Sequence, residues 1–335
     1  MKAIVQDRYG GLDVLSLREI DEPVVEADEV LVRVHAASVH PDVWHCMRGR
    51  PYVLRVIGAG LRRPKNRVPG TDIAGHVESV GTGVTRFRPG DEVFGETLKG
   101  HQWHNGGAYA ELAAVPEEAL APKPAGLTFE QAAAVPTSAF IALKCLREEG
   151  GVRPGQKVLI NGAGGGVGTF AVQLAKAFGA EVTAVDAAVK LEMLRSIGAD
   201  RVMDLAGEDF TRGVERYDVI LDIPGNHSIS DCRRALTRDG TYVFVGHDGF
   251  GASRGRWFGS LGRFLRLLVV TPFVSQRLTP RSYKDPTDPL SVVKELIEAG
   301  QLTPVVDRTF PLAEVPEAIR YLTTGRARGK IVITM

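Results

Sequence analysis

A run of glycines between residues 162 and 168 is the stretch best suited to chemistry, because glycine lets backbone approach a ligand closely. The run, NGAGGGVG, follows the apolar segment Lys157–Asn161 and precedes a helical pattern. A glycine turn that opens a helix binds anions at the helix N-terminus, and a dinucleotide pyrophosphate is the usual one. Valine at Gly165 or Gly168 is expected to abolish binding and leave the chain folded. We therefore predict dinucleotide contacts from Ala163, Gly164, Gly165, Gly166, Val167 and Gly168.

Asp186 supports the same prediction. It ends a second apolar segment, Glu181–Val185, and stands 18 residues after Gly168, where an acid that binds the adenosine ribose is expected. A carboxylate at this place hydrogen-bonds a ribose 2′-hydroxyl and repels a 2′-phosphate, which favours NADH over NADPH. Lys190 leaves the alternative open, since its ammonium could neutralise such a phosphate. The motif departs from the strict pattern at Ala163, where the first glycine usually stands.

The glycine turn belongs to an alternation of strands and helices that runs from Leu127 to about Gly246. Such alternation predicts an α/β fold with a Rossmann-type doubly wound parallel sheet. Ligands of these sheets lie at the carboxyl ends of the strands. For Asp222, at one strand end, a cofactor contact and a plain turn carboxylate remain open. Three positions after strands are expected to line the cofactor groove: Ile223, Gly246 and His247. Besides the first two strands, we predict strands at Arg201–Asp204, Tyr217–Asp222 and Thr241–Val245, and a crossover helix at Ser228–Leu236.

Residues 1–125 follow a different pattern, in which short alternating segments such as Glu29–His35 are separated by glycine and proline. This predicts a β-rich domain. The 335 residues, 44% of them hydrophobic, are enough for two domains. The formal net charge of +1 gives no electrostatic reason to expect nucleic acid. Three widely spaced cysteines suit a cytoplasmic protein, and no apolar run approaches the ~18 residues of a membrane span.

Several separated motifs resemble one known family. They are PGTDIAGHVESVGTGVTRFRPGDEVFG from Pro69, GAYAE at 107–111, AAAVP at 132–136, the glycine turn, and GKIVI at 329–333. Together they are similar to the medium-chain dehydrogenase/reductase superfamily, in its zinc-independent, quinone oxidoreductase-like branch. The resemblance implies a GroES-like β-rich catalytic domain at 1–125, a Rossmann domain at 126–275, and a C-terminal segment, 276–335, that returns to the catalytic domain.

The resemblance also locates the positions where zinc-dependent members hold their catalytic metal. Here those positions carry His40, Thr71 followed by Asp72, and Ala134. Only His40 is a strong zinc ligand, and a catalytic zinc needs three protein ligands. A structural zinc lobe would need four clustered cysteines, and none occurs between Cys46 and Cys145. No zinc is therefore expected.

Without a Lewis acid, hydride delivery from NAD(P)H to an electron-poor acceptor is easier than oxidation of an alcohol. The zinc-free relatives reduce quinones and α,β-unsaturated carbonyls, and we expect the same here. By resemblance Tyr52 stands where related enoyl reductases carry a proton-donating tyrosine, and His40 is the second candidate, as a hydrogen-bond donor in the pocket. Asp42 lies one position from the usual acidic place. Two alternatives stay open: a zinc-independent alcohol dehydrogenase and a non-catalytic dinucleotide-binding redox sensor.

The stretch after Gly246 is the least regular part of the chain. If Trp257–Leu268 is a helix, Trp257, Leu261, Phe264, Leu265 and Leu268 share one face, while Arg263 and Arg266 lie on the other. Because Gly259 and Gly262 weaken this helix, an apolar flap or a subunit contact is favoured over a membrane surface, and we expect a homodimer. The tail is predicted to contain helices Val292–Ala299 and Val315–Thr324 and strands Thr303–Val306 and Lys330–Thr334.

Overall fold

The computed structural model describes residues 1–97, 106–246, 257, 259–280 and 289–335. The chain forms two compact units. The first contains residues 1–137, 290–298 and 304–335, and the second contains residues 138–289 and 299–303. The α/β fold with a parallel sheet is confirmed. No helix in the described ranges is long and apolar enough to cross a membrane.

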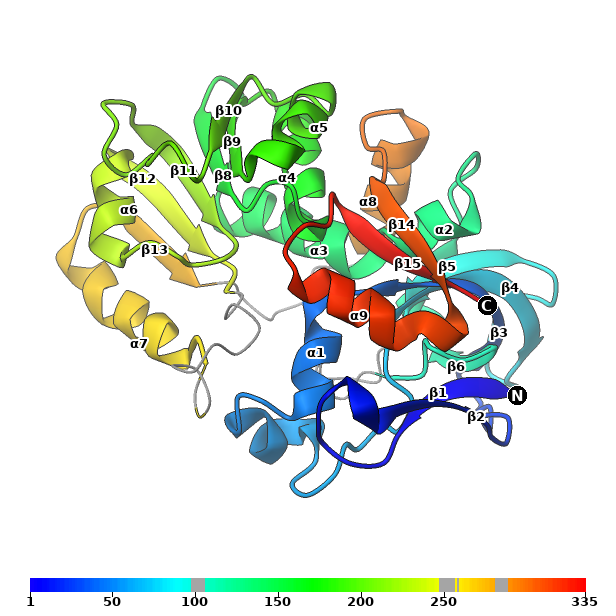
Figure 1. Ribbon diagram of the computed structural model, residues 1–335. Coiled ribbons are helices and arrows are strands. Elements are labelled where there is room, and N and C mark those ends of the chain that lie inside the picture. The colour runs from blue at the N-terminus through cyan, green and yellow to red at the C-terminus, as the bar shows by residue number, and fades with distance from the viewer. Residues whose placement is uncertain (98–105, 247–256, 258, 281–288) are drawn as a thin grey trace. The chain divides into compact units, whose positions relative to one another are not determined.

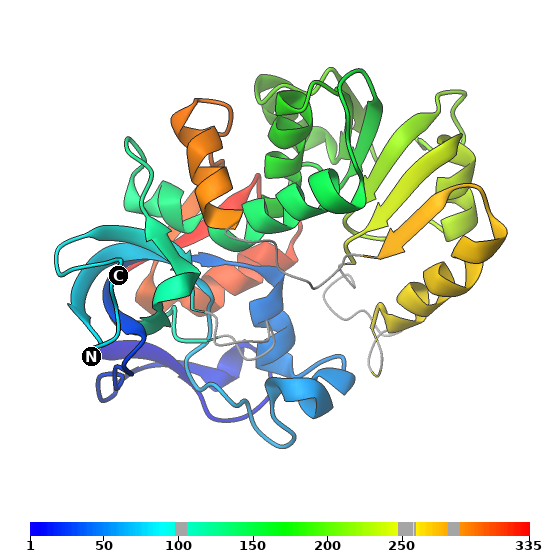
Figure 2. The ribbon, with the colours of Figure 1, turned by 180° about the vertical axis from the view of Figure 1, so that it is seen from behind.

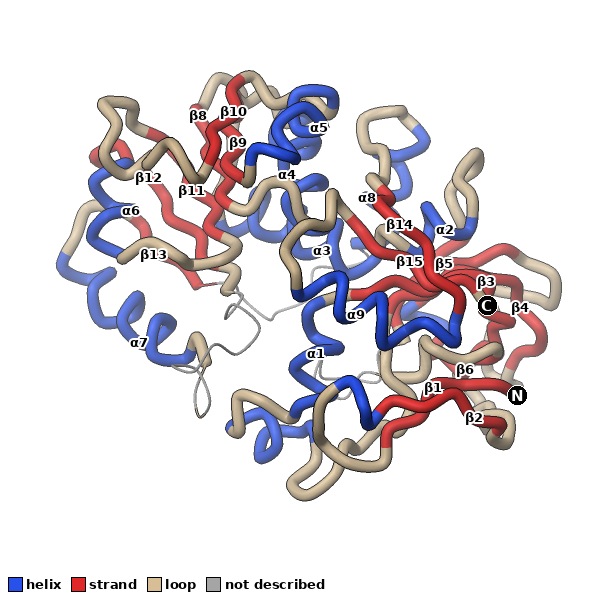
Figure 3. Tube along the Cα trace, viewed as in Figure 1, coloured by secondary structure: helices blue, strands red, loops and turns tan. Residues whose placement is uncertain are grey.

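The first unit is rich in strands, which are coloured red in Figure 3. One seven-stranded sheet has the order β14-β15-β3-β4-β5-β7, with β6 paired to β3, and β1 and β2 form a separate antiparallel pair. The strands are β1 (Lys2–Gln6), β2 (Leu15–Glu19), β3 (Glu29–Val39), β4 (Asp72–Val80), β5 (Glu92–Glu96), β6 (Leu112–Pro116), β7 (Leu120–Pro122), β14 (Val306–Pro311) and β15 (Lys330–Thr334). The helices are α1 (Pro41–Arg48), α2 (Phe129–Ala133), α8 (Pro289–Glu298) and α9 (Val315–Thr323), and α3 (Pro136–Lys144) contains the boundary between the units.

The register of β3 and β4 explains how distant residues of the first unit come to one edge. The two strands are antiparallel, with Ala37 opposite Ile73. The end of β3, where His40 follows, therefore lies beside the start of β4, where Thr71 precedes. The C-terminal strand β15 pairs with the other side of β3, as Figure 1 shows, so the chain end contributes to the same sheet.

The second unit is a six-stranded parallel sheet in the order β10-β9-β8-β11-β12-β13. This order changes direction at β8, which is the topological switch point of a doubly wound fold. Helix α4 packs on β8 and β9, α6 on β12 and α7 on β13 (Figure 2). The strands are β8 (Lys157–Asn161), β9 (Glu181–Asp186), β10 (Arg201–Asp204), β11 (Tyr217–Asp222), β12 (Leu236–Phe244) and β13 (Arg277–Pro280), and the helices are α4 (Gly166–Ala177), α5 (Leu191–Ser196), α6 (Ile229–Ala235) and α7 (Leu261–Val270).

The sequence around the glycine turn folds as its pattern predicts. Four of the five residues of β8 are buried, as expected for a strand covered on both faces. Helix α4 begins at Gly166, and the residues from Val167 to Ala175 are all buried. Gly179 then has a φ of 79°, a conformation that glycine adopts without strain and that commonly ends a helix.

The chain after Gly246 differs from the sequence prediction in one strand that was placed wrongly and one that was not predicted. The strand expected at Thr303–Val306 instead begins at Val306 and extends to Pro311. Strand β13 was not predicted, although it forms the edge of the parallel sheet. Arg263 lies on the face of α7 that packs against the sheet: its side chain is 18% exposed and hydrogen-bonds inward, beside Leu267 and Phe264.

Candidate functional site

The glycine turn joins β8 to α4 at the carboxyl edge of the second unit's sheet. Gly162, with a φ of 82°, and Ala163 both donate their backbone N–H to the carbonyl of Val185, at 3.0 and 3.1 Å. These bonds join the turn to the end of β9. Gly165 caps the helix without any side chain, so the N–H groups of its first turn have no side-chain acceptor. The predicted contacts Ala163 to Gly168 therefore form one continuous turn.

Two glycines of this turn have different roles. A Cβ on Gly165 would meet no atom closer than the carbonyl oxygen of Gly162, at 3.7 Å, so the space above it is open. A Cβ on Gly168 would lie 2.3 Å from that same oxygen and 2.4 Å from the carbonyl oxygen of Ala163. Gly168 is thus needed for the helix to approach the turn. The expectation that valine at Gly168 leaves the chain folded is therefore wrong.

Asp186, the last residue of β9, is already held by three partners. Its Oδ2 accepts from the N–H of Gly164 at 2.7 Å, and its Oδ1 accepts from the N–H of Ala187 at 2.8 Å. The ammonium of Lys190 lies 3.2 Å from Oδ1, and both side chains are buried. Asp186 and Lys190, which the sequence offered as alternatives, are a pair. Their contact neutralises the carboxylate directly beside the glycine turn.

Asp222, the last residue of β11, has no exposed surface and a different set of partners. Its Oδ1 accepts from the side-chain amide of Asn161 at 2.9 Å and from the N–H of Gly225 at 3.0 Å. Its Oδ2 accepts from the hydroxyl of Tyr242 at 2.6 Å and lies 3.3 Å from Arg263. Burial and the adjacent Asp222 raise the pKa of Tyr242, so that its hydroxyl remains a donor. This network favours a structural role for Asp222 over a cofactor contact.

Of the three other positions predicted to line the cofactor groove, the structure describes two. Ile223 donates its N–H to the carbonyl of Asn161 at 3.1 Å, which keeps it at the end of β8. Gly246 follows β12 and has a φ of 85°, a conformation that favours glycine. His247 lies outside the described residues.

His40 is the N-terminal cap of α1 in the first unit, and its neighbour Asp42 contacts it. The Nδ1 atom of His40 lies 3.4 Å from the N–H of Asp42 and 3.2 Å from its carboxylate. Because Nδ1 accepts from this amide as the helix cap, Nε2 is the ring nitrogen left to donate a hydrogen bond. Asp42 thus orients the imidazole of His40, a function that the sequence did not assign to it.

The positions at which zinc-dependent family members hold their catalytic metal lie near His40, in the first unit. His40 and Thr71 are 8% and 5% exposed, and Ala134 is fully buried. Asp72 accepts hydrogen bonds from Ser38 at 2.7 Å and from Thr137, and it lies 3.2 Å from the ammonium of Lys330. Within the ranges that the structure describes, no group of three His, Cys, Asp or Glu residues could hold a metal ion.

Tyr52 lies in the loop between α1 and the next helical turn, η2 (Arg55–Ala59), and is half-buried. Its ring is flanked by two guanidinium groups, Arg50 at 5.7 Å and Arg55 at 4.9 Å from the ring centroid. Arg55 also lies over the ring of Tyr9, at 4.2 Å. Cations on an aromatic face hold the ring in place.

Comparisons with known proteins agree with this architecture. A family model described as the alcohol dehydrogenase GroES-like domain matches residues 26–125, and one described as zinc-binding dehydrogenase matches residues 197–333. NAD(P)H oxidoreductase RTN4IP1, mitochondrial, of Mus musculus is 31% identical over 375 residues, covering 100% of this chain and 89% of that protein. The 2-methylene-furan-3-one reductase of Solanum lycopersicum is 32% identical over 342 residues, covering 99% of this chain and 79% of that protein.

Among solved structures, the quinone oxidoreductase from Coxiella burnetii has a TM-score of 0.83 and 27% sequence identity, with 100% of this chain and 99% of that chain covered. The fold of this chain therefore matches that of a known oxidoreductase over its whole length. Together with relatives above 30% identity over nearly the full length, this confirms the resemblance seen in the sequence: the chain belongs to the medium-chain dehydrogenase/reductase superfamily of oxidoreductases.

Proposed function

We propose that this protein transfers a hydride from NAD(P)H to a quinone or an α,β-unsaturated carbonyl acceptor, without a catalytic metal. The open space above Gly165, at the N-terminus of α4, is the observation that carries the proposal. A pyrophosphate fits there, because a helix N-terminus supplies backbone N–H donors and a positive dipole end. The relatives named NAD(P)H oxidoreductase and 2-methylene-furan-3-one reductase support the reductive direction.

The donor set at the zinc positions does not fit zinc. A catalytic zinc needs three nitrogen, sulfur or carboxylate ligands, whereas Thr71 and Ala134 offer a hydroxyl and a methyl group. The neighbouring carboxylate, Asp72, is engaged by Lys330 and by two hydroxyl groups. We therefore propose a metal-free reaction, although the family model for residues 197–333 is named after zinc binding.

Reduction of a quinone or an enone requires a hydride and a proton. When bound, NAD(P)H supplies the hydride. Asp42 holds the imidazole of His40 in one orientation, so we assign to His40 the donation of a hydrogen bond or a proton to the acceptor oxygen. Arg50 and Arg55 hold Tyr52, and its hydroxyl is the second candidate donor.

We also propose that NADH is preferred over NADPH. The ammonium of Lys190 is buried and bound to Asp186, so it would have to leave that carboxylate to bind a 2′-phosphate. An ionised carboxylate has about four acceptor sites, and three are filled at Asp186, which leaves one for a ribose hydroxyl.

The test is steady-state turnover of chelator-treated protein. NADH or NADPH is supplied with benzoquinone, menadione and an enone, and the loss of nicotinamide absorbance is followed. Turnover with at least one acceptor, unchanged after chelation, is expected. Turnover that chelation abolishes and zinc restores would contradict the metal-free reaction, and tight cofactor binding without turnover of any acceptor would favour a redox sensor. Burial and Asp222 raise the pKa of Cys232 to about 12, so its thiol is a poor redox sensor.

A further inference from the structure

One stretch of the first unit, which begins in α1 and ends just before β4, carries a one-sided charge. The 29 residues from 43 to 71 contain seven arginines and lysines and neither aspartate nor glutamate, and all of them lie in the described ranges. Since the whole chain has 41 basic and 40 acidic side chains, the other residues hold 34 basic and 40 acidic ones. Positive charge gathered in this way raises the local concentration of anions.

Most of these cations are not neutralised by protein acids. Arg67 pairs with Asp7, and Arg55 donates to the carbonyls of Gly49 and Arg48 at 2.9 and 3.2 Å. The other five have no ion pair with any residue that the structure describes: Arg48, Arg50, Arg62, Arg63 and Lys65. The last three of these are exposed to water, whereas the first two are partly buried. A partly buried cation without an acid beside it favours an anionic ligand.

Arg48 ends α1 and lies on the same face of that helix as His40. These two residues and Trp44 follow one another at every fourth position, which places them in one row along the helix (α1 in Figure 1). The guanidinium of Arg48 lies 5.0 Å from the centroid of the Trp44 ring, so the side chain points back toward His40. At the usual rise per residue, His40 and Arg48 are about 12 Å apart along the axis. The row therefore has a candidate proton donor at one end and a cation at the other.

The guanidinium of Arg48 has an N–H group without an acceptor. Its Nε atom is buried and hydrogen-bonds to no residue that the structure describes. A buried donor of this kind is uncommon and marks the place of an ion, a water molecule or a ligand. Arg50 lies two residues further on, 5.7 Å from the ring of Tyr52, the second candidate donor. The planar fork of a guanidinium matches a carboxylate in geometry and charge.

The turn that follows α1 is held by side chains, which fixes the backbone from which both arginines project. Four successive carbonyls each accept a hydrogen bond from a side chain: Met47 from Gln6, Arg48 and Gly49 from Arg55, and Arg50 from Nδ1 of His45. Gly49 has a φ of 57°, a conformation that favours glycine and ends the helix. The two cations therefore start from a fixed turn rather than from a loose loop.

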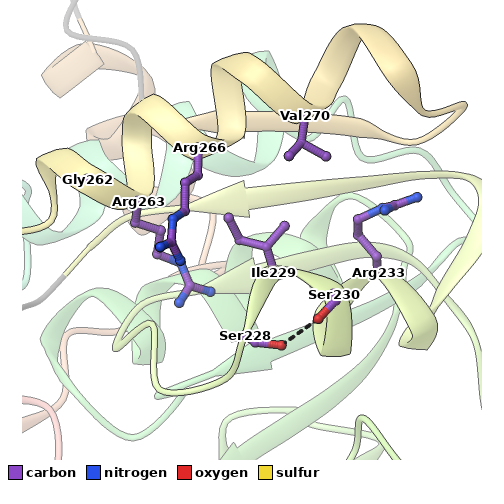
Figure 4. Close-up of a pocket in the computed structure, with 8 residues that line it drawn as sticks. All are labelled: Ser228, Ile229, Ser230, Arg233, Gly262, Arg263, Arg266 and Val270. Carbon is purple, nitrogen blue, oxygen red and sulfur yellow. Dashed lines mark hydrogen bonds between the residues drawn. The ribbon is translucent and has the colours of Figure 1, made fainter.

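Arginines also line a cavity of about 440 Å³ between α6 and α7 in the second unit (Figure 4). There Arg263 is bound to Asp222, and Arg233 donates to the side chain of Gln276 at 2.9 Å. These guanidinium groups already have acceptors in the protein. Because Arg48 has none among the described residues, the first unit is the better place for an anion.

We propose that the acceptor carries a carboxylate and that Arg48, with Arg50 beside it, binds this group. The inference rests on the proposed hydride transfer and narrows its substrate class to quinones or enones with an acidic side chain. With the carbonyl oxygen of the acceptor at His40, the chain of the acceptor runs along α1 past Trp44, and its carboxylate meets Arg48. Arg48 is then a specificity-determining residue for the acceptor.

The test compares kcat/KM for two acceptors, 10-oxodec-8-enoate and its methyl ester, with the full chain and its preferred nicotinamide cofactor. Both contain the same enal, and the charge is separated from it by methylene groups, so their intrinsic reactivity is equal. Wild type should prefer the carboxylate about tenfold or more, and added salt should reduce this preference. Arg48→Gln should lower the ratio of the two kcat/KM values about tenfold, and Arg48→Lys should lower it less, because lysine keeps the charge and loses the fork.

Two further variants separate a specific contact from a general field. Arg50→Gln should lower the ratio about threefold, which gives a second measure of the site. Arg62→Gln is the matched control, since it removes one exposed charge from the same stretch, and it should keep the wild-type ratio. Equal kcat/KM values for the two acceptors in wild type would overturn the inference. An equal fall of the ratio in Arg62→Gln and Arg48→Gln would overturn it as well.

Failure of the proposed function gives a different result. Reduction of the ester as readily as the carboxylate would contradict only the role of Arg48. Turnover of neither compound, nor of the neutral quinones, would contradict the hydride transfer itself. In that case titration calorimetry with 10-oxodec-8-enoate still decides the anion site: weaker binding to Arg48→Gln than to wild type would support it, and equal binding would overturn it.

Discussion

Two aspartates end the strands on either side of β8, Asp186 on β9 and Asp222 on β11. Both are buried, and each accepts a hydrogen bond from a glycine N–H, that of Gly164 or of Gly225. Position in the sheet therefore does not distinguish them. Their other partners do.

The partners of Asp186 are local, since all lie between residues 164 and 190. Those of Asp222 come from β8, β12 and α7, and Asp222 has no exposed surface. Asp186 retains a small exposed fraction beside the open space of the glycine turn. The comparison teaches that a strand-end acid is a ligand candidate where its partners leave an edge open, and a structural residue where they enclose it.

The largest effect is expected for Asp222→Ala. It leaves the charge of Arg263 partly buried without its carboxylate, which should lower the free energy of unfolding by about 3–5 kcal/mol. Asp186→Ala should lower it by about 1–3 kcal/mol, because its losses are hydrogen bonds at the edge of the sheet. Urea unfolding at neutral pH measures both. Equal losses of unfolding free energy in the two variants would contradict the difference proposed between Asp222 and Asp186.

A smaller effect is expected for Tyr242→Phe, which removes only the hydroxyl that donates to Asp222. Its cost should be about 1.5–3 kcal/mol, the size of a hydrogen bond to a charged group. The same unfolding experiment checks it. A loss well below that of Asp222→Ala would confirm that the whole network, rather than this one bond, stabilises the edge.

The choice between NADH and NADPH tests whether Asp186, unlike Asp222, contacts the cofactor. Asp186→Ser should relax or reverse a preference for NADH, changing the ratio of kcat/KM values roughly ten- to a hundredfold, as expected for one charge-assisted hydrogen bond of ~1.5–3 kcal/mol. Lys190→Ala is the paired variant. Suppose instead that wild type prefers NADPH tenfold or more and that Lys190→Ala removes this preference. Lys190 then hydrogen-bonds the 2′-phosphate and sets the cofactor specificity, and the ribose assignment of Asp186 is wrong.

The smallest effect is expected at Asp200, an acid of the same unit that is neither enclosed nor at the turn. Partial burial alone would raise the pKa of Asp200, but hydrogen bonds from Lys176 and from the N–H of Val182 lower it overall. Its contribution is therefore complete above the ordinary pKa of 3.8 and is lost as the pH falls through the lowered pKa. Asp200→Asn should cost at most about 1 kcal/mol near neutral pH, and the difference from wild type should shrink in acid.

The parts of the site that depend on local spacing could be predicted from the sequence. The turn from Gly162 to Gly168 and the strand that ends at Asp186 lie within one βαβ unit, where glycine conformation and hydrophobic period decide the structure. The superfamily and its oxidoreductase character were also predicted, and both are confirmed. The pairing of Asp186 with Lys190 is local as well, but the sequence allowed either partner to bind the cofactor.

Contacts between distant residues could not be predicted in this way. Asp72 and Lys330 are 258 residues apart, and only the pairing of β15 with β3 brings them together. The contact of Arg263 with Asp222 was not predicted, because helical period separates the two faces of α7 but does not tell which of them packs on the sheet. The clash at Gly168 likewise depends on how closely the helix approaches the turn.

One measurement tests most directly whether the glycine turn binds the dinucleotide: the affinity of Gly165→Val for NADH, by titration calorimetry, beside wild type and Gly165→Ala. The valine methyl groups would fill the open space above residue 165, while no protein atom lies closer than 3.7 Å to the new Cβ. We predict at least a hundredfold weaker binding, about 2.7 kcal/mol, with an unchanged unfolding midpoint. Wild-type affinity for NADH in folded Gly165→Val would show that the pyrophosphate does not bind at this turn.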